Sequence, residues 1–309
     1  MAESKASVRE VRLRVPASTS NLGPGFDTLG LALGLYNEFL FERVEGESRF
    51  SVEGEGAEVL RQGPSRVLWA LEAASAALGV PAPAIRLTQH NQIPLARGLG
   101  GSGTAALAGI VAAFLFAGRQ LEPAQILSLG LKMEGHPDNI TPQTVGGFVV
   151  SRAVDDEVIY LKLAPPAGLT SVVLVPDRPL DTGLARRALP EQYSRADVIY
   201  NLSNVALLVA SLATGDIRHL AQAMRDRIHQ PYRAPLLPGL LEIIDAALRA
   251  GSPGAALSGA GSGIFAFARA GQEQAIAAAM EAAAAKYGMA AYSLFLPVDT
   301  QGLEVLDVR

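Results

Sequence analysis

The feature that most constrains the fold is an uncharged run of 21 residues, from Gly98 to Gly118. A run of that length could cross a bilayer as a helix. Its first six residues are GLGGSG, however, so only residues 105–117 form a continuous apolar helical segment. A segment of that length suits the buried core of a globular domain. We therefore expect a core helix that begins directly after a glycine-rich loop, and no membrane span.

Composition narrows the class of protein further. Hydrophobic residues make up 49% of the 309 residues and charged residues 18%, a balance typical of a folded chain with a large core. Lys and Arg number 26 against 30 Asp and Glu, for a net charge of −4, and they form no basic run, so we expect no nucleic-acid partner. The absence of cysteine excludes disulfides, thiolate-bound zinc, iron–sulfur clusters and a thiol nucleophile. Residues 1–15 are charged throughout and lack the apolar stretch of a signal peptide, which predicts a cytoplasmic protein with no membrane partner.

The order of strand-like and helix-like segments predicts an α+β fold in two domains. Strands are expected mostly in adjacent pairs rather than in alternation with single helices. Pro165-Pro166 marks the expected boundary between residues 1–165 and residues 166–309. The expected strands cover residues 11–15, 35–44, 48–56, 84–93, 148–154, 157–163, 171–176, 264–268 and 291–298. The expected helices cover residues 65–78, 103–117, 123–134, 196–213, 216–228, 237–250 and 272–287.

A first glycine-rich segment, residues 16–27, lies between two expected strands. It reads PASTSNLGPGFD, and Ser, Thr, Asn, Gly and Pro are turn formers, which is typical of a surface loop. Asn21 and Asp27, however, flank a Gly-Pro-Gly turn that could fold them toward one pocket. A plain connector needs fewer specified residues than this segment has, so both interpretations stay open.

A second segment, PLARGLGGSGT (residues 94–104), runs directly into the expected core helix. Residues 98–103 match G-x-G-x-x-G, but the dinucleotide-binding motif needs a strand–turn–helix–strand unit, and here the helix leads to another helix. No G-K-S/T sequence occurs, which excludes a Walker A loop. Glycine N–H groups at a helix N-terminus still form a phosphate site, to which Ser102 and Thr104 could add hydroxyls. The alternative is that these glycines serve only close helix packing.

Several motifs together carry a family resemblance. PASTSNLGPGFDTLG, PLARGLGGSGTAA, EGHPDN and the late LSGAGSG (residues 257–263) resemble, in order and at plausible spacing, the successive motifs of the GHMP kinases. Within that superfamily, NLGPGFD, EGHPDN, ARRALP (185–190) and DRIHQPYRAPLLPG (226–239) resemble the homoserine kinases. The resemblance covers nearly the whole chain.

The resemblance implies a two-domain GHMP-kinase fold, with a ribosomal-S5-domain-2-like N-terminal half and a ferredoxin-like C-terminal half. It implies that ATP phosphorylates the side-chain hydroxyl of L-homoserine, with Mg²⁺, in a cleft between the halves, as a step of threonine biosynthesis. It also implies a homodimer. The alternatives are another small-molecule kinase of the superfamily, such as the mevalonate type, and a ligand-sensing relative without turnover.

The resemblance implies a role for each residue of this chain that matches a functional position in the family's motifs. The residues expected to bind ATP are Pro94, Leu95, Ala96, Arg97, Gly98, Leu99, Gly100, Gly101, Ser102, Gly103 and Thr104. Those expected to bind homoserine are Asn21, Asp27, His136, Asn139, Thr182, Arg186 and Arg233. Those expected to serve catalysis are Asn21, Glu134, His136 and Arg186. Ser102 and Glu134 match the family's Mg²⁺ ligands, and a small number of oxygen donors suits that ion.

The charges of homoserine explain the substrate residues. Its ammonium needs an acceptor such as Asp27, and its carboxylate is best held by the guanidinium groups of Arg186 and Arg233. Mevalonate also has a carboxylate, so Asp27 discriminates between the two acceptors better than the arginines do.

The resemblance also implies that no side chain acts as a strong general base. Phosphoryl transfer gains mainly from positioning and charge neutralisation, so we expect direct attack of the hydroxyl on the γ-phosphate and a structural role for Asp138. This chain departs from the family at Gly101 and Gly103, where serines are usual, and at Ser262-Gly263, where Pro-Thr is usual. The remaining histidines have polar neighbours and are expected on the surface: His90, His219 and His229.

Overall fold

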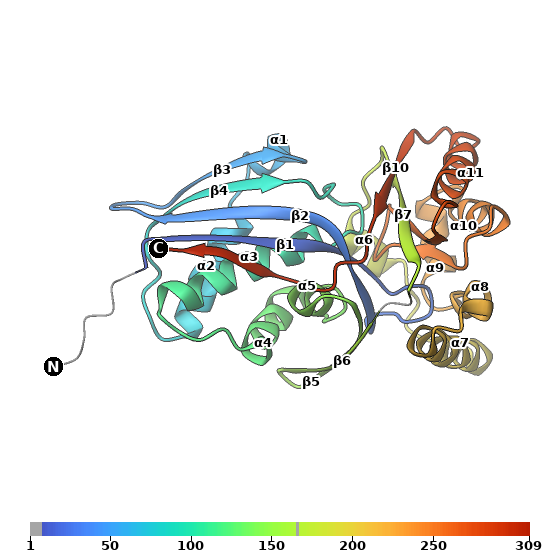
Figure 1. The fold of residues 1–309 in the computed structure, drawn as a ribbon, viewed down its shortest axis with the longest axis horizontal. Coiled ribbons are helices and arrows are strands. Elements are labelled where there is room, and N and C mark those ends of the chain that lie inside the picture. Colours follow the sequence, from blue (N-terminus) through green and yellow to red (C-terminus); the bar gives the residue numbers. More distant parts are fainter. Residues whose placement is uncertain (1–7, 165–166) are drawn as a thin grey trace.

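The computed structural model describes residues 8–164 and 167–309, so the expected boundary at Pro165-Pro166 lies outside the described residues. Two lobes lie side by side along the long axis of the molecule, each built on its own β-sheet (Figure 1). The α+β class expected from the sequence is confirmed.

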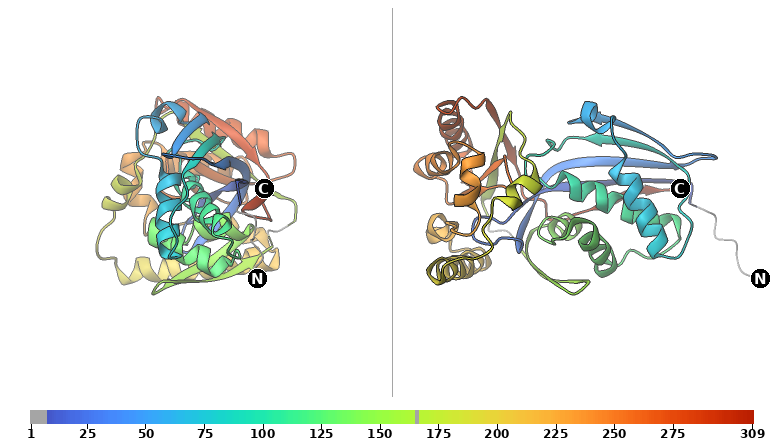
Figure 2. Two further views of the ribbon diagram at one scale, coloured as in Figure 1. Left: turned by 90° about the vertical axis from the view of Figure 1, so that its left-hand side faces the viewer. Right: turned by 180° about the vertical axis from the view of Figure 1, so that it is seen from behind.

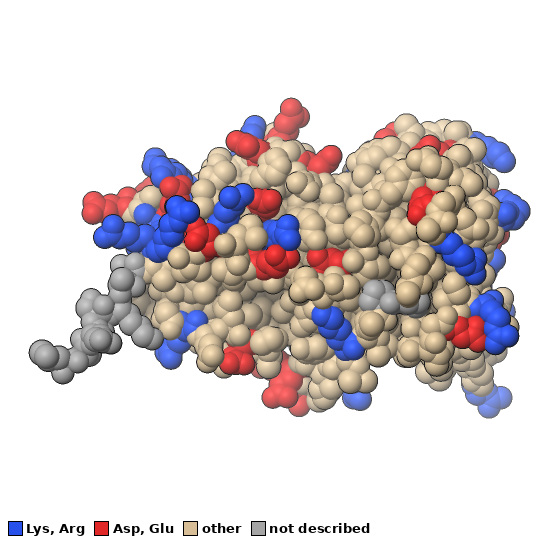
Figure 3. All heavy atoms as spheres, in the orientation of Figure 1, with Lys and Arg blue, Asp and Glu red and all other residues tan. Residues whose placement is uncertain are grey.

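The first lobe contains a seven-stranded sheet with the strand order β11-β1-β2-β4-β3, and β5 pairs with both β2 and β6. Apolar and polar residues alternate along β1, so Leu13 and Val15 face the core while Arg12 lies on the open face. On that face Arg12 pairs with Glu38 at 2.9 Å, and acidic and basic side chains are intermixed (Figure 3). The strands are β1 (Glu10–Ser20), β2 (Leu29–Arg43), β3 (Arg49–Gly54), β4 (Ile85–Asn91), β5 (Phe148–Val154), β6 (Glu157–Leu163) and β11 (Glu304–Val308).

Helices cover the other face of this sheet (Figure 2). They are α1 (Ala57–Leu60), α2 (Arg66–Ala77), α3 (Gly101–Phe116), α4 (Pro123–Glu134) and α5 (Ile140–Val145). Every residue of α3 from Gly103 to Phe114 is buried, because α2 and α4 pack beside it and the sheet lies beneath it. The predicted core helix is therefore confirmed.

The second lobe contains a four-stranded antiparallel sheet in the order β10-β7-β9-β8. Helices α10 and α11 pack on one face, and the other face shares a core with α7 and with the ends of β1 and β2. The strands are β7 (Leu169–Pro176), β8 (Ala255–Leu257), β9 (Ile264–Arg269) and β10 (Ala291–Leu296). The helices are α6 (Thr182–Arg187), α7 (Arg195–Thr214), α8 (Leu220–Ala223), α9 (Gln230–Arg233), α10 (Leu240–Arg249) and α11 (Glu273–Ala285), with short 3₁₀ turns η1 (Ile217–His219) and η2 (Ala234–Leu236). This βαββαβ order with the last strand beside the first is the ferredoxin-like arrangement.

The structure differs from the expected elements in several details, of which three concern the site or the topology. Residues 16–20, expected in a loop, continue β1, because β2 begins at Leu29 and pairs with them. Residues 216–228 do not form one helix, because Asp226 accepts the backbone N–H groups of residues 228–230 and stabilises a turn there. The sequence pattern does not predict β11, which pairs with β1 and returns the end of the chain to the first lobe. The division at residue 165 stays a prediction.

Helix α7 is, among the described residues, the one helix whose length and composition would allow it to cross a membrane. Of its 18-residue apolar window, 28% is buried, and Leu208 and Leu212 pack in the core that the two lobes share. The uncharged run at residues 98–118 is a different segment, and its helix lies inside the first lobe.

Candidate active site

A cleft of about 520 Å³ lies where the two lobes meet. Segments far apart in the chain build its wall: the end of β1, residues 94–102, residues 134–139, and the surroundings of Arg186 and Arg233. Every residue expected to bind homoserine lines this cleft, and Glu134 does so too. The structure thus brings the predicted site residues together, and their roles stay predictions.

The expected phosphate loop turns sharply into α3. Gly98 and Gly100 have φ angles of +67° and +72°, which glycine adopts without strain. A Cβ at Gly98 would lie 1.9 Å from the carbonyl oxygen of Ser258, so no side chain fits there. The first residues of α3 line the cleft, and the positive end of the helix dipole favours an anion in front of them.

The third glycine-rich segment, residues 257–263, supports this loop from the second lobe. The Ser258 hydroxyl donates to the carbonyl oxygen of Gly98 (2.7 Å), and the N–H of Gly263 donates to that of Arg97 (3.1 Å). Two glycine-rich segments from different lobes therefore form one wall of the cleft.

The Arg97 side chain fastens the phosphate loop to β7. Its guanidinium donates to the carbonyl oxygens of Pro176 (2.6 Å), Leu95 (2.8 Å) and Asp177 (3.0 Å). Because the Arg97 side chain is engaged in these bonds, any contact of Arg97 with ATP is expected from its backbone.

Gly103 and Thr104, the last two residues of the expected ATP-binding segment, do not line the cleft. Thr104 is fully buried, and its hydroxyl donates to the Gly101 carbonyl oxygen (2.8 Å) and accepts from Asn37 (3.0 Å). A Cβ at Gly103 would lie 2.4 Å from Oε1 of Gln143, whereas one at Gly101 would meet nothing within 4 Å. Because an α-helix turns by about 100° per residue, positions 103 and 104 point away from the ligand side of the helix start.

Glu134, the last residue of α4, points toward the start of α3. Its Oε2 accepts from the Ser102 hydroxyl (2.8 Å), and its Oε1 forms an ion pair with the guanidinium of Arg66. The side chain of Glu134 is 8% exposed. Sequence reasoning missed Arg66, because a single arginine at the start of a helix indicates no site.

Asp27 and Arg186 form a bidentate ion pair, with N–O distances of 2.7 and 3.0 Å. Asn21 and Asp27 have φ angles of 68° and 53°, left-handed values that are strained in residues other than glycine. The Asn21 amide holds this conformation, since it accepts the N–H of Asp27 (3.0 Å) and donates to the carbonyl oxygen of Gly259 (2.8 Å). Thr182, at the start of α6, is exposed at the cleft.

Arg233 is a buried cation, 1% exposed, that forms no ion pair with any described residue. It donates to the carbonyl oxygens of Ala185 (3.3 Å) and Gly259 (3.1 Å), and lies 3.2 Å from Nδ1 of His229. Burial, and then repulsion from Arg186, lowers the pKa of Arg233 from 12.5 to about 10. A buried cation without an anionic partner is costly, so this position favours an anionic ligand.

His229 is fully buried, so its expected place on the surface is wrong. Its Nε2–H donates to the carbonyl oxygen of Gly23 (2.7 Å), which leaves Nδ1 to accept from Arg233. Burial lowers the pKa of His229 and keeps the ring neutral. The polar neighbour Asp226 does not expose His229, because it binds backbone N–H groups of the same turn.

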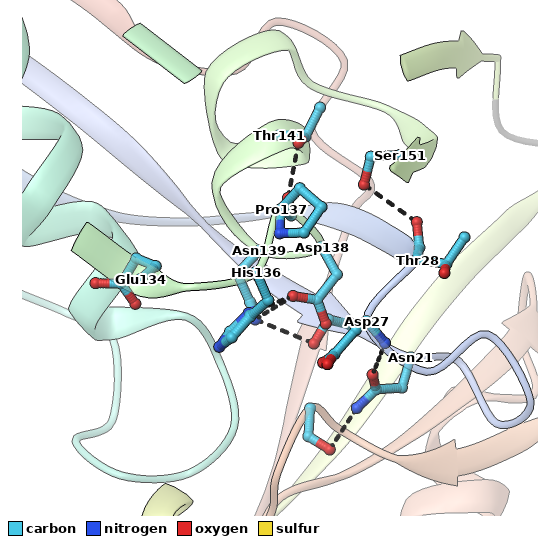
Figure 4. A network of polar contacts seen from close by, with 12 residues as sticks. Asn21, Asp27, Thr28, Glu134, His136, Pro137, Asp138, Asn139, Thr141 and Ser151 are labelled. Carbon is cyan, nitrogen blue, oxygen red and sulfur yellow. Dashed lines mark hydrogen bonds and ion pairs between the residues drawn. The ribbon is translucent and has the colours of Figure 1, made fainter. Parts of the chain in front are cut away.

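His136 and Asp138 form a pair in the turn after α4 (Figure 4). Nδ1 of His136 lies 2.6 Å from Oδ1 of Asp138, whose carboxylate is 2% exposed. Burial lowers the pKa of His136, but the hydrogen bond and charge of Asp138 outweigh it, so the pKa is raised above 6.5. Asn139 holds the turn on β1, because it accepts from Ser18 (3.0 Å) and donates to Ser20 (3.1 Å).

Comparison with known proteins decides the family. The model named GHMP kinases N terminal domain matches residues 65–147, and the model named GHMP kinases C terminal matches residues 208–286. The homoserine kinase of Moorella thermoacetica is 41% identical over 278 residues, which cover 90% of this chain and 93% of that relative. The chain belongs to the homoserine kinase family.

Other members agree in sequence and structure. The homoserine kinase of Deinococcus radiodurans is 42% identical over 262 residues, which cover 84% of each chain. The crystal structure of homoserine kinase from Cytophaga hutchinsonii has a TM-score of 0.85 at 27% identity and covers 99% of both chains. Mevalonate kinase of L. major in complex with R-mevalonate has a TM-score of 0.74 at 17% identity, so it shows the fold alone. The two-domain GHMP-kinase fold is confirmed.

This homoserine kinase family member has a second, mainly apolar cavity of about 160 Å³, which we call the annex. The annex shares Arg66, Leu95 and Ser102 with the cleft, so the two lie side by side. Its apolar lining includes Phe50, Val52, Leu60, Val67, Ile93 and Leu95, and its polar lining includes Asn37, Gln89 and Asn91. Sequence reasoning missed these residues, because they are scattered over several elements and no motif marks them.

Phe26 is a further residue that sequence reasoning missed. Its ring lies 5.5 Å from the guanidinium carbon of Arg186, 5.3 Å from that of Arg233 and 5.3 Å from the ring of His229. Both arginines of this family member therefore contact one aromatic ring, whose faces favour cations.

Proposed function

We propose that this chain is an ATP-dependent homoserine kinase. It transfers the γ-phosphoryl group of ATP to the side-chain hydroxyl of L-homoserine and releases ADP and O-phospho-L-homoserine, a step of threonine biosynthesis. The observation that carries the proposal is that the unpaired Arg233 and the Asp27–Arg186 pair share one cleft with a glycine-rich helix start. The cleft thus offers partners for the ammonium and the carboxylate of an amino acid, next to a helix start that favours phosphate.

The ammonium of homoserine would bind Asp27, and its carboxylate would bind Arg186 and Arg233. Charge-assisted hydrogen bonds of this kind are about twice as strong as neutral ones. Arg233 gains most from the substrate, because its charge is buried and unpaired without it. With the charged end held there, the terminal hydroxyl would point toward the phosphate loop.

ATP would lie along the start of α3 and into the annex. Its phosphates would accept from backbone N–H groups of residues 98–102, where the helix dipole adds to the attraction. The apolar lining of the annex suits the adenine ring, and the amide side chains of Asn37, Gln89 and Asn91 could bind its polar edge.

Ser102 and Glu134 would hold Mg²⁺ together with the phosphates of ATP. Their oxygens are hard donors, and the Glu134 carboxylate already lies beside one cation, so the site fits a divalent ion. When bound, the metal supplies charge neutralisation to the phosphates. The donor atoms of a second group, on Asp27, His136 and Asp138, lie within 4.8 Å of one another, but here Asp27 would bind the ammonium of homoserine, and His136 and Asp138 bind each other.

The reaction would proceed by direct attack of the hydroxyl on the γ-phosphorus: the bond from that phosphorus to the bridging oxygen of ADP breaks, and the hydroxyl proton passes to an oxygen of the transferred phosphoryl group rather than to a strong general base. The raised pKa of His136 favours the protonated ring, which is a proton donor, over the neutral ring that a base requires. It would therefore neutralise phosphate charge, while Asp138 holds the ring in place through Nδ1. Asn21 would act by fixing the backbone at Asp27.

Three further assignments belong to the proposal. We propose that the chain works in the cytoplasm, forms a homodimer, and divides into domains at residues 1–165 and 166–309. The family resemblance supports the first two, and Pro165-Pro166 supports the division into domains.

The experiment that tests this function is coupled ADP release with Mg·ATP, with L-homoserine, mevalonate, galactose and no acceptor in parallel. Turnover with homoserine alone is expected. Turnover with mevalonate or galactose instead would overturn the substrate assignment, and a folded protein that binds ATP without any turnover would overturn the kinase assignment.

A further inference from the structure

We infer that Arg66 is an internal counter-ion for Glu134, which neutralises the carboxylate in the free protein and must be displaced when metal and nucleotide bind. The inference rests on the metal site proposed above. Arg66 is the first residue of α2, and its side chain lines both the cleft and the annex. The guanidinium pairs with Oε1 of Glu134 and donates to the carbonyl oxygen of Met133 (3.2 Å).

Both carboxylate oxygens of Glu134 are engaged, Oε1 by Arg66 and Oε2 by Ser102. Mg²⁺ binds carboxylate oxygens at about 2.0–2.1 Å. An ion at that distance from Oε1 would lie against the guanidinium, and an ion on Oε2, beside Ser102, would share the same carboxylate with it, so in either position the two cations repel each other. Arg66 and the metal are therefore alternative partners of Glu134.

The exposed fractions of the two side chains indicate that Arg66, rather than Glu134, is the partner that moves. The side chain of Arg66 is 42% exposed and that of Glu134 8%. A carboxylate buried to this extent is costly without a cation, whereas an exposed guanidinium returns to water at little cost. The exchange keeps Glu134 paired throughout, with Arg66 before the metal enters and with the metal afterwards.

A natural reporter lies near this ion pair. Trp69 is the only tryptophan of the chain and is 47% exposed. Its ring centroid lies 5.5 Å from the guanidinium carbon of Arg66. Movement of Arg66 changes the surroundings of the indole, and therefore its fluorescence.

The competition between Arg66 and the metal for Glu134 is tested by titrating the full chain with Mn²⁺ in the absence of nucleotide. Electron paramagnetic resonance measures the concentration of free Mn²⁺ at each point. Arg66→Gln is expected to bind Mn²⁺ about three- to fivefold more tightly than the wild type. This change in affinity corresponds to the upper end of the free energies measured for ion pairs with an exposed partner. Arg66→Lys keeps a cation and is expected to lie between the two. Glu134→Gln is expected to bind more weakly.

Arg86→Gln is the matched control. Arg86 is 48% exposed and pairs with Glu42 at 2.7 Å on the open face of the first sheet, so this change removes the same charge away from the cleft. Its Mn²⁺ affinity is expected to equal that of the wild type. Circular dichroism verifies that each variant is folded.

The outcomes separate this inference from the proposed function. Mn²⁺ should change Trp69 emission in the wild type and much less in Arg66→Gln. If Arg66→Gln binds Mn²⁺ like the wild type while Glu134→Gln binds it more weakly, the inference is overturned and the metal site stands. If neither change alters Mn²⁺ binding, the metal site and the inference both fail, while homoserine-dependent ADP release decides the kinase activity independently.

Discussion

Replacement of Arg233 by methionine should separate catalysis from stability. The change removes a guanidinium that is 1% exposed and keeps an unbranched, apolar side chain in its place. The lowering of the Arg233 pKa from 12.5 to about 10 corresponds to about 3 kcal/mol against the charged form in the folded protein. Methionine relieves this cost, but it leaves the carbonyl oxygen of Ala185 and Nδ1 of His229 without their donor, at about 1–3 kcal/mol each, whereas the carbonyl oxygen of Gly259 keeps its bond from Asn21. The two effects are of similar size and opposite sign, so the free energy of unfolding should change by about 3 kcal/mol or less.

Activity should respond differently. Hydrogen bonds to charged groups contribute about 1.5–3 kcal/mol, so loss of the guanidinium should lower kcat/KM for L-homoserine by about 10- to 150-fold. The KM for ATP should stay near the wild-type value, because Arg233 lies on the homoserine side of the cleft. Coupled ADP release with each substrate varied in turn measures both constants, and urea denaturation measures stability.

Two results would refute this reasoning. Homoserine kinetics equal to those of the wild type would show that Arg233 does not hold the carboxylate. A loss of several kcal/mol of stability would show that Arg233 is a structural residue rather than a charge kept for a ligand. His229→Gln is a milder companion change, which should raise the KM for homoserine less than Arg233→Met does, because it removes only the ring that positions the guanidinium.

Other predictions test the helix start and the turn after α4. Gly103→Ala should destabilise the protein by about 1–2 kcal/mol, because its Cβ would lie 2.4 Å from Oε1 of the buried Gln143, whereas Gly101→Ala, with nothing within 4 Å, should be neutral or slightly stabilising. Urea denaturation of both variants measures this difference, and equal midpoints would contradict it. His136 should stabilise the fold below about pH 6.5, and that stabilisation should be lost as pH rises through its raised pKa, because the charged ring pairs with Asp138. The gap in unfolding free energy between the wild type and His136→Gln should therefore shrink from pH 6 to pH 9, and a gap that does not vary with pH would contradict the ion pair.

The parts of the molecule that were predictable depend on local pattern. The core helix α3 followed from an apolar run after glycines, and its residues from Gly103 to Phe114 are indeed buried. The alternation of polar and apolar residues located β4 within two residues at either end. The sequence motifs also predicted residues that line the cleft. The polar residues of these motifs are far apart in sequence but lie together around one cavity.

The parts that were not predictable depend on contacts between distant residues. His229 has polar neighbours in sequence, yet Asp226 folds onto the backbone beside it and buries it. Strand β11 has only five residues, and it forms because β1 offers an open edge. Arg66 lies far in sequence from Glu134, and only the packing of α2 beside α3 brings them together.

If Asp27 and Arg186 hold the substrate as proposed, their ion pair should give the cleft a preference for amino acids over acceptors that carry a carboxylate alone. In the free protein Arg186 is already bound by both oxygens of Asp27. A ligand with only a carboxylate must draw Arg186 away and leave Asp27 without its cation, which costs about 1–3 kcal/mol for a partly buried charge and offsets the gain. An α-amino acid supplies an ammonium to Asp27 at the same time as its carboxylate reaches Arg186. Arg233, which forms no ion pair with any described residue, would then share the carboxylate with Arg186, so both charges of an amino acid find partners while a lone carboxylate leaves Asp27 exposed to the loss of its cation.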